Sequence, residues 1–194
     1  MSTDSDAAPA GPDFSQGVYA STLPEDGVFA GHVNGEAIIV ARTSDGIVAL
    51  GGACSHYNGP LREGLRVGDT INCPWHHACF DLKTGRALKA PALAPVARWK
   101  VEEEGGKVFI REALPEEASS APALMADKHF VIIGGGASGF AAAQRLRERG
   151  FAGQLTMISS DVDAPYDRPN VSKDYLAGTA DPAWMPLKDE AFYK

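Results

Sequence analysis

The sequence predicts two domains of different class: an all-β domain followed by the start of an α/β domain. From about Gly17 to Arg111, short apolar runs rich in β-branched residues alternate with Gly, Pro, Asn and Asp, a pattern typical of an antiparallel sandwich or small barrel. After residue 127 the pattern changes to an apolar run, a glycine-rich turn and a helical segment, which is the order of a strand–helix–strand unit. A chain of 194 residues is long enough for two small domains.

The expected strands of the first domain are short and end at turn-forming residues. They include "EAIIVART" at 36–43, "GIVALGG" at 46–52, "DTINCP" at 69–74 and "GKVFIRE" at 106–112. We place this domain at residues 17–112. The polar residues 1–16 are predicted to be a disordered leader, and residues 113–127, rich in Ala, Pro, Ser and Glu, are predicted to be a linker.

The second domain is predicted at residues 128–194 and opens with the buried strand "HFVII". A glycine turn leads into a helix that stops at Gly150, with arginines in its last turns that complement the helix dipole. The segment "GQLTMISSD" at 153–161 is the expected second strand. A strand, a helix and a strand in succession predict the beginning of a parallel α/β domain.

The composition excludes several classes of function. A net charge of −7 and a pI near 5.2 argue against nucleic-acid binding, because the chain has no basic stripe to neutralise phosphates. No stretch approaches the roughly 20 apolar residues of a membrane span, and the N-terminus lacks the basic and apolar regions of a secretory signal. Three cysteines cannot form a full disulfide framework, so we expect a cytoplasmic protein whose thiols are free to bind metal.

Two short segments bounded by Gly and Pro carry the metal-binding residue types. They read Cys54-x-His56 and, after sixteen intervening residues, Cys73-x-x-His76, so each offers one thiolate and one imidazole. A structural zinc finger normally supplies its cysteine pair and its histidine pair at separate ends. The mixed order fits a 2Fe–2S centre of the Rieske type better, because one iron there takes two thiolates and the other takes two imidazoles. We therefore predict these four residues as ligands.

The segments "CSHYNGPL" and "CPWHHACFDLKTGRAL" resemble the two cluster-binding loops of Rieske ferredoxin domains. The resemblance implies a Rieske fold for the first domain. In high-potential Rieske proteins each loop carries a further cysteine and the two form a disulfide, but Gly59 and Trp75 stand at those positions here. Ala78 and Phe80 replace residues whose hydroxyl groups bond the cluster in those proteins, which implies a reduction potential near the low end of the family range of about −150 to +300 mV.

Two neighbours of the second loop are predicted not to bind the metal. His77 departs from the glycine that the family usually has, and we interpret it as a loop residue facing solvent. Cys79 has no partner cysteine and is interpreted as a structural thiol beneath the loop.

The glycine turn of the second domain has the spacing of a dinucleotide-binding motif. Gly134, Gly136 and Gly139 lie between the expected strand and helix, where they permit a tight turn, the approach of a pyrophosphate, and helix–strand packing. The helix N-terminus would then face the phosphates. Asp161, twenty-two residues after Gly139 at the end of the second strand, is suited to binding ribose hydroxyl groups. The motif alone does not choose between FAD and NAD.

The segment "PYDRPNVSKDYL" at 165–176 resembles the flavin-site segment of oxygenase-coupled ferredoxin reductases and of apoptosis-inducing-factor-like flavoproteins. That resemblance implies FAD as the cofactor, with Arg168 and Lys173 in contact with the flavin. Residues 17–194 together resemble the Rieske-containing branch of apoptosis-inducing-factor-like pyridine nucleotide-disulfide oxidoreductases. The implied enzyme passes electrons from NAD(P)H to FAD, to the 2Fe–2S cluster and on to an acceptor protein such as an oxygenase.

The resemblance also implies further domains, so we expect this chain to be the N-terminal part of a reductase that is inactive, and binds FAD weakly or not at all, on its own. The alternative is a Rieske ferredoxin-type electron carrier without reductase activity. A Rieske oxygenase subunit is not favoured, because it needs a second iron site with two histidines and His129 is the only histidine after the cluster motif.

Overall fold

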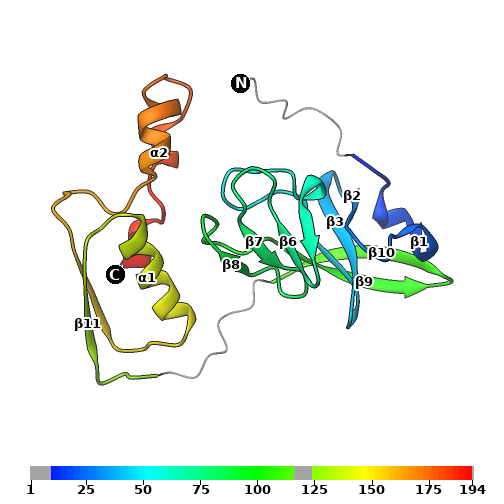
Figure 1. The fold of residues 1–194 in the computed structure, drawn as a ribbon, viewed down its shortest axis with the longest axis horizontal. Helices are drawn as coiled ribbons and strands as arrows, with labels where there is room; N and C mark the ends of the chain where they lie inside the picture. Colours follow the sequence, from blue (N-terminus) through cyan, green and yellow to red (C-terminus); the bar gives the residue numbers. More distant parts are fainter. Residues whose placement is uncertain (1–9, 116–123, 194) are drawn as a thin grey trace. The chain divides into compact units, whose positions relative to one another are not determined.

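The computed structural model describes residues 10–115 and 124–193, and the chain divides into two units, Met1–Glu116 and Glu117–Lys194 (Figure 1). The first unit consists of two antiparallel sheets, and the second contains a parallel pair of strands with one long helix.

The larger sheet of the first unit has six strands in the order β1-β10-β9-β4-β3-β2. Four consecutive residues of β3, 38–41, are buried because both faces of this strand are covered. Ile38 and Val40 enter one core, and Ile39 and Ala41 enter a second core on the other face. The strand bounds are β1 Val18–Tyr19, β2 Phe29–Val33, β3 Glu36–Thr43, β4 Gly46–Gly51, β9 Arg98–Glu104 and β10 Lys107–Leu114.

The smaller sheet has four strands in the order β5-β6-β7-β8, and the second of the two predicted ligand segments connects β6 to β7. Its inward-facing Ile71 and Phe80 are fully buried against Ile39 and Leu50 of the larger sheet. The two sheets therefore share one apolar core, which supports the cysteine-containing loops from below. The strand bounds are β5 Leu65–Val67, β6 Thr70–Asn72, β7 Cys79–Asp81 and β8 Ala87–Lys89, and a short 3-10 helix, Leu61–Glu63, precedes β5.

Arg66 in β5 points inward and ties the two sheets together. Its guanidinium donates to the backbone carbonyls of Gly68 at 2.8 Å and Gly27 at 3.0 Å, and to that of Arg42 in β3. Because side chains alternate along a strand, the neighbouring Leu65 and Val67 face outward and are more than half exposed.

The folded part of the first unit begins earlier than the sequence predicted. Phe14 lies in a 3-10 helix, Phe14–Gln16, and its ring is fully buried, so the expectation of a disordered leader over 1–16 fails for these residues. The Asp13 carboxylate accepts a hydrogen bond from the Ser15 N–H and caps this turn. A second 3-10 turn follows at Ala20–Thr22. Residues 1–9 of the predicted leader lie outside the described residues.

The predicted linker at 113–127 is also shorter than expected where the structure describes it. Strand β10 continues to Leu114, and Leu124 already pairs with Phe151 of the second unit. Both ends of the segment are therefore part of a folded unit. Residues 116–123 lie outside the described residues.

The second unit contains the predicted strand–helix–strand arrangement. Strands β11 (His129–Ile133) and β12 (Gln154–Ile158) pair in parallel, and α1 (Ala137–Glu148) packs against both. The helix ends two residues before Gly150, which has a φ of 85° that favours glycine. Phe140 on α1 and Phe151 after it are buried.

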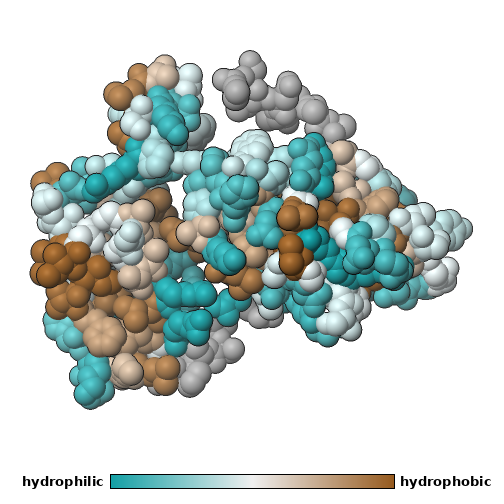
Figure 2. Space-filling view, in the orientation of Figure 1, coloured by the Kyte–Doolittle hydropathy of each residue, from teal (hydrophilic) through white to brown (hydrophobic). Residues whose placement is uncertain are grey.

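Apolar side chains of the two parallel strands remain exposed. Val131, Ile133 and Ile158 are all more than half exposed, and Figure 2 shows apolar surface gathered over β11. Parallel sheets are normally covered on both faces. Here α1 covers one face, and the exposed side chains show that the face away from α1 is open. Short helical turns follow β12 at Arg168–Asn170 (α2), Val171–Tyr175, Pro182–Trp184 and Glu190–Tyr193.

Among residues 10–115 and 124–193, no helix is long and apolar enough to span a membrane.

Three turns of the first unit are joined by the ammonium group of Lys83. It lies 2.8 Å from an Asp45 carboxylate oxygen and 3.0 Å from one of Asp69, and it donates to the Ser44 hydroxyl at 2.7 Å. Hydrogen bonds from Lys83 hold the pKa of both Asp45 and Asp69 below the usual range. The network connects the β3–β4 turn, the β5–β6 turn and the segment after β7.

Removing this charge should change the acid sensitivity of the fold. A carboxylate with a lowered pKa stabilises the folded state above its ordinary pKa of about 4, and this contribution is lost as the pH falls. We expect Lys83→Met to lower the melting temperature near neutral pH and to converge with the unmodified protein in acid. Thermal melts from about pH 7 to pH 3 measure this. Lys89→Met, an exposed charge deletion in β8, is the control and should show a pH-independent difference. Parallel curves for Lys83→Met would contradict the expectation.

Candidate functional site

The first cysteine loop is a tight turn with two backbone hydrogen bonds across it. Ala53 and Pro60 form an antiparallel bridge at its base. The Cys54 N–H donates to the Gly59 carbonyl at 2.9 Å, and the Asn58 N–H donates back to the Cys54 carbonyl at 2.9 Å. Asn58 adopts a left-handed conformation with φ 56°, which closes the turn.

The second cysteine loop repeats this backbone arrangement. Its base is the β6–β7 pair Asn72 and Cys79. The Cys73 N–H donates to the Ala78 carbonyl at 2.8 Å, and the His77 N–H donates to the Cys73 carbonyl at 3.1 Å. His77 has φ 60° and so takes the same left-handed position as Asn58 in the first loop. The left-handed backbone gives a physical reason for a glycine at position 77, and the histidine there carries strain.

These matched loops bring the two cysteine thiols together in the core. Cys54 and Cys73 are almost completely buried and interact with each other. Burial raises the pKa of the Cys54 thiol; the His56 N–H opposes this increase, the Cys73 thiol adds to it, and the Tyr57 N–H opposes it. The two N–H groups therefore point at a sulfur atom that would be costly to ionise without a positive partner.

The two predicted histidine ligands lie together on the outer side of the loops. The rings of His56 and His76 have centroids 5.0 Å apart and are nearly perpendicular, at 85°. Tyr57 packs beside them, with its ring centroid 4.1 Å from that of His56 and 6.0 Å from that of His76. His76 is exposed, whereas His56 is half-buried and its Nδ1 atom is inaccessible.

The four residues therefore form a buried thiol pair and an outer imidazole pair. Within the part of the chain that the structure describes, no three His, Cys, Asp or Glu side chains are arranged around one shared ion. A Rieske cluster does not require such a group, because its two irons divide the ligands into a cysteine pair and a histidine pair. The chemistry of the donor set and its division into two pairs fit that cluster.

Gly59 and Trp75 join the two loops without a disulfide. A Cβ atom at position 59 would lie 2.7 Å from the Cys73 sulfur and 3.3 Å from the Trp75 ring. The indole thus covers the glycine, and a larger residue at 59 would displace the sulfur or the ring. Trp75 remains more than half exposed and forms part of the surface beside His76.

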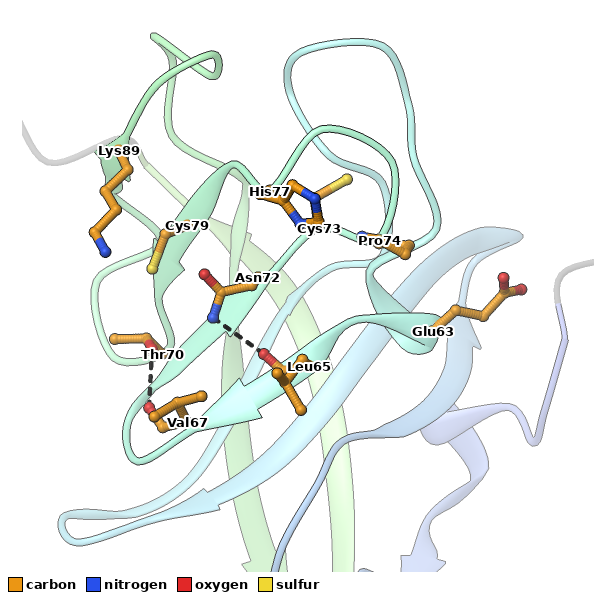
Figure 3. A pocket seen from close by; sticks show the side chains of 10 residues that line it. All are labelled: Glu63, Leu65, Val67, Thr70, Asn72, Cys73, Pro74, His77, Cys79 and Lys89. Atoms are coloured by element: carbon orange, nitrogen blue, oxygen red, sulfur yellow. Dashed lines mark hydrogen bonds between the residues drawn. The ribbon is translucent and has the colours of Figure 1, made fainter.

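His77 and Cys79 lie near each other and near Cys73. Both line a groove on the outer face of β5–β7 that also includes Leu65, Val67 and Asn72 (Figure 3). His77 is exposed, and the sulfur atoms of Cys73 and Cys79 point in different directions. The interpretation of His77 and Cys79 as residues that do not bind metal stays a prediction.

A third segment, residues 90–96, lies against the first loop and was not singled out from the sequence. The Ser55 hydroxyl, between the two ligands of that loop, donates to the Ala94 carbonyl at 2.5 Å. Pro91 and Pro95 were the available signal, because they restrict the backbone of this segment. Sequence spacing alone does not show which loop such a segment contacts.

In the second unit, the glycine turn has the close contacts that its motif requires. Gly134 has φ 116°, and a Cβ atom at Gly139 would fall 1.9 Å from the Gly134 carbonyl oxygen. Gly134 donates to the Ile158 carbonyl at 2.7 Å, which connects the turn to the end of β12. The turn therefore leaves its backbone open directly before α1.

Asp161 and Arg168 lie close to this turn and to each other, although different roles were predicted for them. Arg168 donates to the Asp161 carboxylate at 2.5 Å, and its guanidinium lies 3.9 Å from where a Cβ of Gly136 would be. Arg168, which was predicted to contact the flavin, thus lies beside the residues predicted to bind the ribose and the pyrophosphate. Lys173 is exposed in the π-helical segment Val171–Tyr175. Whether these residues contact a flavin stays a prediction.

Comparisons with known proteins support the first site. Residues 16–100 match the family described as "Rieske [2Fe-2S] domain". Over 69 residues the chain is 46% identical to the 3-phenylpropionate/cinnamic acid dioxygenase ferredoxin subunit of Escherichia coli (strain K12), covering 35% of this chain and 63% of that protein. The ferredoxin of carbazole 1,9a-dioxygenase from Nocardioides aromaticivorans IC177 is 27% identical, with 48% of this chain and 92% of that chain covered and a TM-score of 0.46. Residues 16–100 thus carry a Rieske-type domain.

The chain is also similar to apoptosis-inducing factor 3 of Homo sapiens, with 28% identity over 169 residues. The alignment covers 81% of this chain and 27% of that protein, so the chain spans about a quarter of the length of this relative. Because 81% of the chain exceeds the whole of the first unit, Met1–Glu116, the similarity extends into the second unit.

The strained backbone at His77 leads to a stability prediction. Replacing His77 by Gly removes the left-handed penalty, which is about 1–2 kcal/mol, against a smaller entropic cost of glycine in the unfolded chain. We expect His77→Gly to raise the free energy of unfolding by about 0.5–1 kcal/mol. Asn58→Gly is the matched control at the equivalent position and should change stability less, because Asn tolerates this conformation better. Denaturant titration measures both, and destabilisation by His77→Gly would show that the side chain makes a contact worth more than the strain.

Proposed function

We propose that this chain is an electron-transfer protein whose first unit holds a Rieske-type 2Fe–2S cluster through Cys54, Cys73, His56 and His76. The observation that carries the proposal is the matched pair of turns that places two buried thiols together and two imidazoles together. The family match over residues 16–100 supports the same cluster.

The residues of the site have distinct tasks in this proposal. The cluster supplies one-electron chemistry, and the chain supplies its ligands, their orientation and the exclusion of water. The apolar core around Cys54 and Cys73 excludes solvent from the thiolate side, and the N–H groups of His56 and Tyr57 stabilise negative charge on the Cys54 sulfur. The exposed His76 is the ligand most accessible to a redox partner.

The fuller form of the proposal is a reductase that takes electrons from NAD(P)H through FAD to the cluster. Gly134, Gly136 and Gly139 would hold the FAD pyrophosphate, Asp161 the ribose, and Arg168 and Lys173 would complete the site. The close approach of Gly139 to the Gly134 carbonyl supports this assignment, because the tight turn of the motif requires glycine at position 139. The similarity to apoptosis-inducing factor 3, which extends into the second unit, favours this form.

The second candidate is a Rieske ferredoxin-type carrier. It would pass electrons to a separate acceptor and have no reductase activity of its own. The 46% identity to a dioxygenase ferredoxin subunit favours this candidate and an oxygenase as acceptor. Both candidates share the cluster, and they differ in whether the second unit binds FAD.

The ligand assignment is tested by comparing two adjacent histidines. Purified protein should contain about two irons and about two acid-labile sulfides per chain, with a mixed Cys/His spectrum. His76→Ala should lose the cluster, because a neutral imidazole ligand is removed, whereas His77→Ala should retain it. Iron analysis and electron paramagnetic resonance of the reduced protein measure this. One zinc without sulfide, or cluster loss from His77→Ala alone, would overturn the assignment.

Binding of FAD separates the two candidates. Whether binding is weak or tight, it should fall at least about tenfold in Gly136→Val, because a side chain there blocks the approach of the pyrophosphate. Ala142→Val adds a branched side chain at an exposed position of α1 and should leave binding unchanged. Calorimetric titration with FAD gives the affinities. Equal binding of FAD by Gly136→Val and by the unmodified chain would reject the flavin site and leave the carrier.

A further inference from the structure

The segment from Ala90 to Val96 is a fixed wall beside the first cysteine loop. Ala92 and Val96 are buried in the same core as the two cysteines. The Val96 N–H donates to the Gly85 carbonyl at 2.9 Å, which anchors the segment to the turn after β7. The Ala94 carbonyl, located between these two buried residues, is therefore held in place.

Ser55 connects this wall to the cluster ligands. It lies between Cys54 and His56, and its hydroxyl donates to the Ala94 carbonyl at 2.5 Å, the short end of the range for this type of hydrogen bond. Rotation of the chain at position 55 would move the sulfur atom on one side and the imidazole on the other. The hydrogen bond opposes that rotation because its acceptor does not move with the loop.

The two histidines also differ in how closely other residues surround them. His56, next to Ser55, is half-buried and lies against the Tyr57 ring at 4.1 Å between centroids. His76 is exposed, and the residue before it, Trp75, is also exposed. A segment that belongs to neither cysteine loop thus holds the first loop at Ser55, directly beside the histidine of that loop.

We propose that Ser55 is a positioning residue for His56, acting through its hydrogen bond to the carbonyl of Ala94. The inference rests on the proposed cluster but does not depend on the flavin. In this proposal the Ser55 hydroxyl determines the orientation of the His56 imidazole plane. It has little effect on the stability of the fold, because an exposed hydroxyl contributes little to global stability.

The test uses two side chains of the same shape at position 55. Ser55→Thr keeps the hydroxyl and Ser55→Val replaces it by a methyl group, and both fit because the Ser55 side chain is exposed. In the holoprotein, Ser55→Val should release iron to a chelator about three- to tenfold faster, the effect of one lost hydrogen bond. It should also change the nitrogen hyperfine coupling of one imidazole in the pulsed paramagnetic resonance spectrum. Ser55→Thr should restore both properties.

Ser44→Val, which removes a hydroxyl from the distant Lys83 network, is the control and should change neither property. The inference is overturned if Ser55→Val and Ser55→Thr release iron equally fast with identical couplings. Should Ser55→Val fail to assemble a cluster while Ser55→Thr assembles one normally, the hydroxyl is required for the site and the inference stands. Unmodified protein that holds no such cluster refutes the proposed function itself.

Discussion

Two cysteine thiols buried side by side are the constraint on which the first unit depends. A thiolate in apolar surroundings is unfavourable unless positive charge and hydrogen-bond donors compensate for the lost hydration. The fold supplies donors from the backbone, at His56 and Tyr57, and the proposed metal centre would supply the positive charge. Both cysteine loops use the same pair of backbone hydrogen bonds, and both close with a left-handed residue, so the two sulfur atoms approach from opposite turns of similar shape.

The rest of the first unit positions these turns. Strand β3 is buried on both faces, and its Ile39 contributes to the core that lies beneath both cysteines. Arg66 fixes the smaller sheet to the larger one through several carbonyl groups, and this inward arginine requires Leu65 and Val67 to face out. Exposed apolar residues beside the second loop are therefore a consequence of how the two sheets are joined.

Sequence periodicity located β3, β4, β6 and β10 of the first unit and both strands of the second, because short apolar runs ended by Gly, Asn or Asp have few other conformations available. The expected strand at 36–43 matches β3, and the motif spacing selected the four residues that the structure brings together. Phe14 was missed because a single aromatic residue in a polar segment carries no periodic signal. Ser55 and its partner Ala94 were missed because the contact joins residues thirty-nine positions apart through a backbone carbonyl, which any residue type provides.

The second unit shows how far local sequence can specify a site. The glycine spacing determines a turn whose shape is enforced by contact with its own backbone at Gly134. The charge at that turn depends on a longer-range feature, the pairing of Arg168 with Asp161. A carboxylate can accept several hydrogen bonds, so Arg168 can orient Asp161 and still leave acceptor sites for a ribose. In the proposed flavin site, the guanidinium beside Gly136 would add positive charge at the point where the pyrophosphate approaches.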